Sequence, residues 1–153
     1  MEPIERISDI HISGMPLYGN PQISVTITDT GGTAKCGALV IGQTKEVGAT
    51  QYGAQIGIID YSRKETDEFG NTTIVVRDFS KRATFTVIVD KTKVDALDKL
   101  LASYRAIPIV YIGSSLYGSM IVFGGYKDWT ITVSLANHSY LNIEIEGLNA
   151  VSN

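Results

Sequence analysis

Residues 82–108 have the sequence RATFTVIVDKTKVDALDKLLASYRAIP, and the hydrophobic period changes within this stretch. Over residues 83–89 apolar and polar side chains alternate, which is typical of a strand with one buried face, here carrying Phe85, Val87 and Val89. Apolar residues then recur at helical spacing, which predicts one amphipathic helix over about residues 92–105. The expected core-facing stripe of this helix contains Val94, Leu97, Leu101 and Tyr104, with Leu100 beside it.

Both ends of the predicted helix carry sequence signals. Thr92, followed three residues later by Asp95, matches a capping-box start. Asp95 and Lys99 form a favourable pair one turn apart. Pro108 keeps Ile107 out of helical geometry, so the helix must end before this proline. A lone helix in a chain otherwise patterned as strands favours assembly over catalysis.

The remaining sequence is patterned as strands and turns. Before the helix we expect two short strands around a turn over residues 8–28, a turn or loop at 29–33, a buried strand at 38–42, and a hairpin with strands at 56–61 and 73–77 and a polar tip at 67–71. After the helix we expect strands at 109–112, 120–123, 129–135 and 140–145. In the last strand Leu141, Ile143 and Ile145 oppose Asn142, Glu144 and Glu146.

These elements predict a mainly β fold of the α+β class: an antiparallel β-sandwich or split barrel with one amphipathic helix. No internal repeat or linker divides the chain, so we expect a single β-rich domain over residues 1–153. Within this domain, residues 1–35 are expected to form an N-terminal hairpin or arm that contacts neighbouring chains.

Composition limits the classes of function. The chain is 44% hydrophobic and 19% charged, which is typical of a folded globular protein, and its net charge of -3 gives no general attraction to nucleic acid. The apolar runs are far shorter than the ~20 residues that span a bilayer, so no membrane insertion is expected. The N-terminus lacks the features of a signal peptide. Cys36 is the single cysteine, which excludes an intrachain disulfide, and we expect it to be a small buried apolar residue.

Candidate catalytic residues are scattered. His11 and His138 are not at metal-ligand spacing from another His or Cys, and a triad of Ser139, His138 and Asp128 is possible on paper but weakly indicated. Glu144 and Glu146 are paired carboxylates on one strand face, which is more typical of solvated or intersubunit salt-bridge residues than of a glycosidase pair.

The other polar clusters have structural interpretations. Oxygen-rich side chains at the hairpin tip could hold calcium, but they match no known ligand loop, so a hydrated tip is favoured. These residues are Glu65, Asp67, Glu68 and Asn71. The glycines of Gly31-Gly32, Gly113 and Gly124-Gly125 lack a phosphate-binding arrangement and are interpreted as turn glycines. We therefore predict no catalytic, cofactor or metal site.

Tyrosine is the one enriched side chain of interest, with eight residues against four phenylalanines. Tyr18, Tyr52 and Tyr117 fall in loops beside glycine. Exposed tyrosines of this kind can stack on sugars or anchor a protein interface. The alternative is that they pack over the edge of the β-structure.

Several strings resemble small tail-region proteins of bacteriophages and prophages, over roughly residues 38–148. The strings are VGATQYG at 47–53, IIDYSRKE at 58–65, FSKRATF at 79–85, YKDW at 126–129 and IEIEGL at 143–148. A coarser likeness is to the tail-tube and distal-tail ring proteins of long-tailed phages. Those proteins share a β-sandwich or split barrel flanked by one helix, and they stack as rings. The hairpin at 56–77 would correspond to their ring-joining hairpin.

The resemblance implies a non-enzymatic structural component of a phage tail, tail tip or baseplate, with a tail-tube-like fold. Its partners would be copies of itself, arranged as a ring or other closed homo-oligomer, and other tail or baseplate proteins. It would be located in the virion tail after synthesis in the host cytoplasm. The alternative is a host-surface glycan-binding module of the adsorption apparatus. A hydrolase of the host envelope is a third class, but the sequence offers no catalytic constellation for it.

Overall fold

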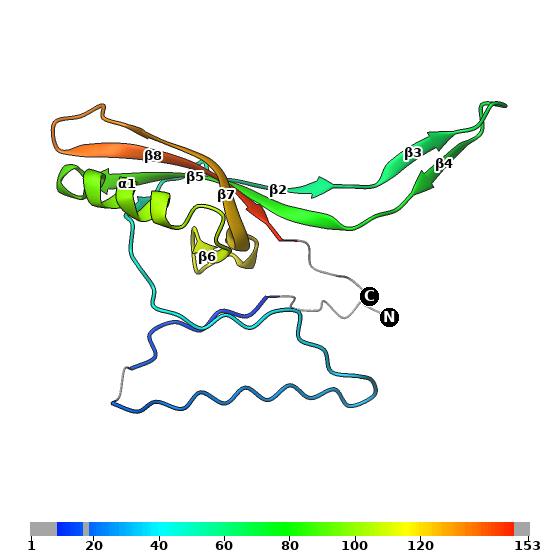
Figure 1. Cartoon of the computed structure of the whole chain (residues 1–153), viewed down its shortest axis with the longest axis horizontal. Helices are drawn as coiled ribbons and strands as arrows, with labels where there is room; N and C mark the ends of the chain where they lie inside the picture. Colours follow the sequence, from blue (N-terminus) through cyan, green and yellow to red (C-terminus); the bar gives the residue numbers. More distant parts are fainter. Residues whose placement is uncertain (1–8, 17–18, 149–153) are drawn as a thin grey trace.

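The computed structural model describes residues 9–16 and 19–148, and the fold of this part is mainly β with one helix (Figure 1). The helix spans 13 residues: a 3-10 turn, η1 (Lys91–Lys93), leads directly into α1 (Val94–Ser103). The described residues form eight strands: β1 (Ala49–Thr50), β2 (Gln55–Asp60), β3 (Arg63–Thr66), β4 (Thr72–Val75), β5 (Phe79–Asp90), β6 (Ile109–Ile112), β7 (Ile121–Thr132) and β8 (His138–Gly147). A short 3-10 turn, η2 (Gly118–Met120), precedes β7.

Six strands form one antiparallel sheet, in the order β1-β5-β8-β7-β6, and β2 also pairs with β5. This sheet curls into a half-barrel, with α1 on its inner side (Figure 1). The remaining strands, β3 and β4, form a separate two-stranded ladder. The structure thus confirms the predicted mainly β fold with one helix, in the split-barrel form.

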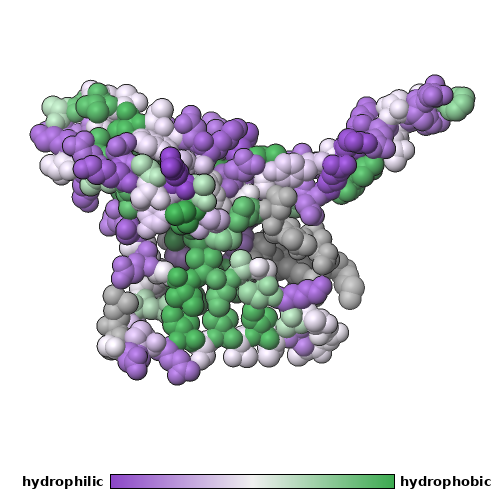
Figure 2. Space-filling model, viewed as in Figure 1, coloured by the Kyte–Doolittle hydropathy of each residue, from purple (hydrophilic) through white to green (hydrophobic). Residues whose placement is uncertain are grey.

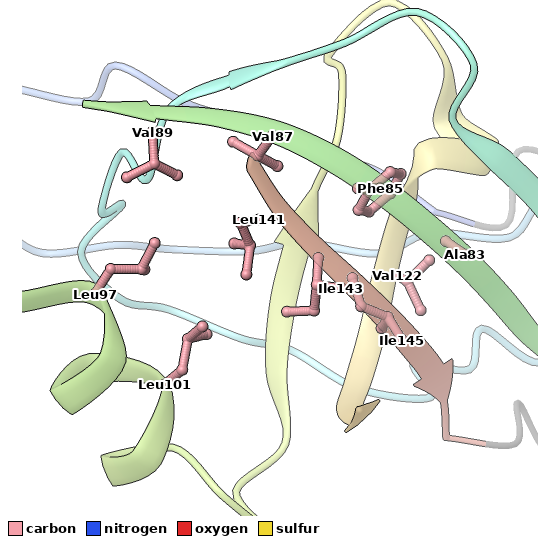
Figure 3. Close-up of a cluster of buried hydrophobic side chains, with 10 residues drawn as sticks. All are labelled: Ala83, Phe85, Val87, Val89, Leu97, Leu101, Val122, Leu141, Ile143 and Ile145. Atoms are coloured by element: carbon pink, nitrogen blue, oxygen red, sulfur yellow. The ribbon is translucent and has the colours of Figure 1, made fainter. Parts of the chain in front are cut away.

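The core lies between the inner face of this sheet and α1. Alternate residues of β5 and β8 face inward, and their register places Phe85 opposite Ile143 and Val87 opposite Leu141. Cross-strand apolar pairs of this kind stabilise a sheet and fix its register. The predicted inward faces of both strands are confirmed. The buried core comprises Ala83, Phe85, Val87, Val89, Leu97, Leu101, Val122, Leu141, Ile143 and Ile145 (Figure 3).

Three of the four residues of the predicted apolar stripe cover the core, whereas the fourth, Tyr104, is partly buried outside the core cluster, with the Lys45 ammonium 5.6 Å from the centre of its ring. Leu97 and Leu101 point from α1 toward β8 and are each 5% exposed (Figure 3). Val94 and Leu100 pack partly buried against the same cluster. The Tyr126 hydroxyl donates a hydrogen bond to the Leu101 carbonyl oxygen at 2.9 Å, which ties the helix to β7.

The ends of the helix differ from the sequence prediction. The carboxylate of Asp90, rather than Thr92, provides the N-terminal cap, because it accepts hydrogen bonds from both the backbone N–H and the hydroxyl of Thr92. With its hydroxyl used in this way, Thr92 does not form the expected capping box with Asp95. At the other end, α1 stops at Ser103, and Ala106 adopts a positive φ of 59° before Pro108.

The expected strands of the N-terminal region are wrong. The described residues 9–16 and 19–48 contain no strand, and the predicted buried strand at 38–42 is exposed throughout. Residues 1–8 and 17–18 lie outside the described part of the chain. Alternation predicts a strand only where a partner ladder and a surface to cover are available. Residues 19–46 are exposed throughout, with Ile23, Val25 and Ile27 at 44%, 54% and 49%, whereas Val47 packs against the core.

The predicted hairpin and its polar tip are confirmed, but the predicted strands at 56–61 and 73–77 do not pair with each other, because a separate strand, β3, lies opposite β4. β2 pairs with β5, and β3 and β4 continue the same two chain segments outward to a tip at residues 67–71 (Figure 1). Every residue of β3 and β4 is exposed, because this part of the hairpin projects away from the half-barrel. The chain therefore places a long, narrow arm outside its own core.

The strands predicted at 120–123 and 129–135 are one strand, β7, which ends at Thr132. Gly124 and Gly125 lie inside it and are not turn glycines. Gly124 pairs with Gly147 of β8, and a Cβ at Gly124 would lie 2.1 Å from the Glu146 carbonyl oxygen. Glycine is required here by close backbone approach between two strands. A register shift between Tyr126 and Asp128 then changes which residues face inward, so that Trp129 and Ile131 pack on the core in the second half of the strand.

Candidate functional site

The outer face of the half-barrel gathers the polar side chains of three neighbouring strands. The register sets Thr84 and Asp128 opposite Glu144, and Thr86 and Thr130 opposite Asn142. Residues paired across strands share a face, and these lie opposite the core. We define the polar face as Thr84, Thr86, Asp128, Thr130, Asn142, Glu144 and Glu146.

Most of these side chains are satisfied within the chain. The Thr86 hydroxyl donates to the Asn142 side-chain oxygen at 2.8 Å. The Lys127 ammonium lies 3.7 Å from a Glu144 carboxylate oxygen. The Tyr61 hydroxyl donates to Glu146 at 3.1 Å and lies 3.1 Å from the hydroxyl of the buried Ser80. Glu144 and Glu146 are thus on one face, as predicted, and each has a partner in its own chain.

A shallow hollow of about 190 Å³ lies in the polar face. Asp128 and Glu144 are cross-strand neighbours at this hollow, so two acidic residues that are far apart in the sequence lie side by side on the sheet. Asp128 accepts a hydrogen bond from the Trp129 backbone N–H at 2.8 Å, which holds its carboxylate along the strand. This arrangement can accept hydrogen bonds from a hydroxyl group or a cation. It lines an open sheet surface, whereas acid-base catalysis uses groups with separately tuned pKa values in a cleft.

The structure does not bring Ser139, His138 and Asp128 together as a catalytic triad. Ser139 is buried on the core side of β8, whereas His138 contacts Tyr140 on the other side, with ring centroids 5.5 Å apart. Asp128 pairs with Glu144, six residues from His138 along β8, which is a distance of about 20 Å at 3.3 Å per residue. His138 therefore acts as a strand-end residue in contact with tyrosine.

The expected burial of Cys36 is wrong. Cys36 is exposed, as are all of residues 19–46, so no surface of the described chain covers it. His11 is half-buried. Within residues 9–16 and 19–148, no group of three His, Cys, Asp or Glu side chains is placed to hold a metal ion.

The hairpin tip is organised by one carboxylate. Asp67 accepts hydrogen bonds from the backbone N–H groups of Phe69 and Asn71, at 3.0 and 2.7 Å, and from the Asn71 side-chain amide at 2.8 Å. The bond from the Asn71 side chain, followed by that from its backbone, lowers the pKa of Asp67 below its ordinary value of 3.8. The oxygens of Asp67 that could have bound calcium thus close the turn, and Glu65 forms an ion pair with Arg63.

We expect Asp67→Ala to loosen this tip, because three hydrogen bonds lose their acceptor. ¹⁵N relaxation should report lower order parameters at residues 68–70. The same loosening is expected in the unchanged protein in acid. The pKa of Asp67 is lower in the folded protein than in the unfolded chain. Its carboxylate therefore stabilises the folded tip fully above pH 3.8, and this stabilisation is lost as the pH falls through the lowered pKa. Glu68→Gln is the matched control and should leave the tip unchanged. A rigid tip in Asp67→Ala would refute this role.

Two of the three loop tyrosines do not pack over the edge of the β-structure. Tyr52, between β1 and β2, and Tyr117, before β7, are both exposed. Tyr18 lies outside the described residues. Sequence reasoning did not single out Tyr61, which joins the hairpin base to β5 and β8. No local signal could have identified it, because its partners Ser80 and Glu146 are 19 and 85 positions away.

A second hollow, of about 450 Å³, lies where the hairpin leaves the half-barrel. Tyr61, Val76, Arg77 and Asp78 line it. Both sides of the hairpin are interrupted here, between β2 and β3 and between β4 and β5. In place of a ladder hydrogen bond, the Arg77 backbone N–H donates to the Ser62 hydroxyl at 3.0 Å.

In the described part of the chain no helix combines the length and the apolar character needed to cross a bilayer. No protein-family model matches the chain, and no curated protein is significantly similar to it in sequence.

Proposed function

We propose that this protein is a non-enzymatic structural component of a bacteriophage tail, tail tip or baseplate. It acts by self-assembly into a ring or other closed homo-oligomer and by contacts with other tail proteins. The proposal places it in the virion tail after synthesis in the host cytoplasm. The order of elements from β5 to β8 and the long hairpin support the likeness to tail-tube and distal-tail proteins, which is a likeness of fold.

The observation that carries the proposal is the surface that a single chain leaves uncovered. A compact monomer of 16.6 kDa would expose about 7,600 Å². This chain exposes 12432 Å². A stable protein interface buries about 1,200–2,000 Å² in total. The excess is therefore larger than one ordinary interface, as expected for a subunit with several neighbours.

Much of the uncovered surface is apolar and lies on two extended parts of the chain. Figure 2 shows apolar groups gathered low in the view, over the N-terminal segment. Contiguous exposed apolar surface of this kind marks interaction sites in soluble proteins. The exposed large apolar side chains of this chain include Ile23, Val25, Ile27, Leu39, Val40 and Ile41 in residues 19–48, and Phe69, Ile74 and Val76 on the hairpin arm.

The glycan-binding module remains the second candidate, and one observation favours it. Tyr52 and Tyr117 are exposed on loops, where aromatic rings can stack on sugar rings. Neither tyrosine lines the two hollows described above. The tyrosines are equally suited to anchor a protein interface, so the structural function is preferred.

One assay separates the three classes of function. The protein is incubated with host envelope polysaccharide and with peptidoglycan, and both new reducing ends and bound glycan are measured. We expect neither turnover nor binding. Turnover that disappears in Glu144→Gln but persists in Glu68→Gln would make the protein a hydrolase of the polar face. Binding that is lost in Tyr52→Ala or Tyr117→Ala would establish the glycan module instead.

A further inference from the structure

β2 presents an open and unprotected sheet edge. Among the described residues it has a ladder partner, β5, along one edge only. Ile56 and Ile58 lie on the core side of the sheet at this edge and are 50% and 58% exposed. Natural edge strands are usually protected by lysine, proline, bulges or a covering segment. β2 contains neither lysine nor proline, and its single charge is the terminal Asp60.

Residues 22–28 have the complementary property. Their sequence QISVTIT alternates strictly between polar and apolar residues and carries no charge. This is the pattern of a strand with one face to bury, yet the run makes no ladder in the folded chain. The chain thus contains an unpaired sheet edge, β2, of six residues and an unpaired strand-like run, residues 22–28, of seven residues.

We propose that residues 22–28 of one copy add as a β-strand to the open edge of β2 in a second copy. The inference rests on the self-assembly in the proposed function and names the surfaces that meet. Main-chain hydrogen bonds along the edge would supply affinity, as in other cases of strand addition. Ile23, Val25 and Ile27 would lie beside Ile56 and Ile58 on the core side of the sheet, which extends the core across the interface.

The positions of the two elements favour a second copy over the same chain. Residues 22–28 lie in the blue run along the bottom of the view, whereas β2 lies in the upper half, in the half-barrel sheet (Figure 1). An ion pair between Asp9 and Lys81 holds the start of the N-terminal segment at β5, where Lys81 is opposite Ile58. Pairing within one chain would require the run to leave its position, whereas a neighbouring β2 can meet it in place. The uncovered surface described above is large enough for such an interface.

The test compares Val25→Pro with Ala34→Pro as the matched control. Both positions are exposed and outside any ladder, so neither change should disturb the half-barrel. Proline at residue 25 removes a backbone donor from the middle of the run, and within sheets proline is confined to solvent-facing positions of edge strands, strand starts and bulges. Sedimentation velocity measures association, and hydrogen exchange measures protection of the β2 amides over a range of protein concentrations.

We expect the wild-type protein and Ala34→Pro to associate and to protect β2 amides more strongly as concentration rises. Val25→Pro should lose this protection and raise the dissociation constant at least roughly tenfold. Equal assembly and equal β2 protection in Val25→Pro would overturn the inference while leaving self-assembly intact. Protection of β2 that does not depend on concentration would mean pairing within one chain and would also overturn it. A wild-type protein that never associates would contradict the proposed function itself.

Discussion

Leu101→Ala is expected to destabilise the folded chain by about 2–5 kcal/mol. Leu101 is 5% exposed and lies between α1 and the inner face of the half-barrel, where Figure 3 shows it directed toward Ile143. The substitution removes buried methyl groups and leaves a cavity that rigid strands cannot easily fill. The hydrogen bond from the Tyr126 hydroxyl is made to the backbone carbonyl of residue 101, so it can survive the change.

Urea unfolding of dilute protein measures this effect, because association would otherwise add to the apparent stability. Leu116→Ala is the matched control: Leu116 is 84% exposed, and the same chemical change there should stay within about 0.5 kcal/mol. Similar unfolding midpoints for the two variants would mean that α1 does not cover the core.

Gly124→Ala is expected to cost about 1–3 kcal/mol or more, because it forces apart two central strands. A Cβ at this position would lie 2.1 Å from the Glu146 carbonyl oxygen and 2.6 Å from the Gly147 Cα. Both neighbours are backbone atoms, so relief requires β7 and β8 to shift relative to each other.

The adjacent Gly125 provides a sharp control, because a Cβ there meets no atom within 4 Å. Gly125→Ala should be neutral, or stabilising by about 0.4–1 kcal/mol through the unfolded state. Urea unfolding together with hydrogen exchange of β7 and β8 amides measures both variants. If Gly124→Ala were as stable as Gly125→Ala, the close pairing of Gly124 with Gly147 would be wrong.

These two sites also show what the sequence could and could not predict. The stripe containing Leu101 is set by local periodicity, and the same holds for the alternating faces of β5 and β8, so these faces were predicted correctly except for Tyr104, which lies outside the core cluster. Gly124 and Gly125 carry a local turn signal that cross-strand pairing overrides, and β7 therefore runs through both. A partner strand more than 20 positions away leaves no local trace in the sequence.

The strand prediction for the N-terminal region was wrong for a related reason. Residues 22–28 have a clear strand pattern, but a pattern does not specify whether a partner edge exists within the chain. The sequence could not decide the helix cap either, because Asp90 and Thr92 are both good capping residues. In the structure the Asp90 carboxylate accepts hydrogen bonds from Thr92. At the polar face, alternation predicted that Glu144 and Glu146 share a side. The cross-strand pairing of Asp128 with Glu144 depends on strand order and could not be predicted from spacing.

The central claim is that this chain is a self-assembling subunit, and its molar mass in solution tests that claim most directly. Light scattering coupled to size exclusion should be run over a range of protein concentrations. We predict a discrete species whose mass is a fixed multiple of 16.6 kDa, as expected for a closed assembly that covers the hairpin arm and the N-terminal apolar surface. A mass of 16.6 kDa at every concentration would contradict the account.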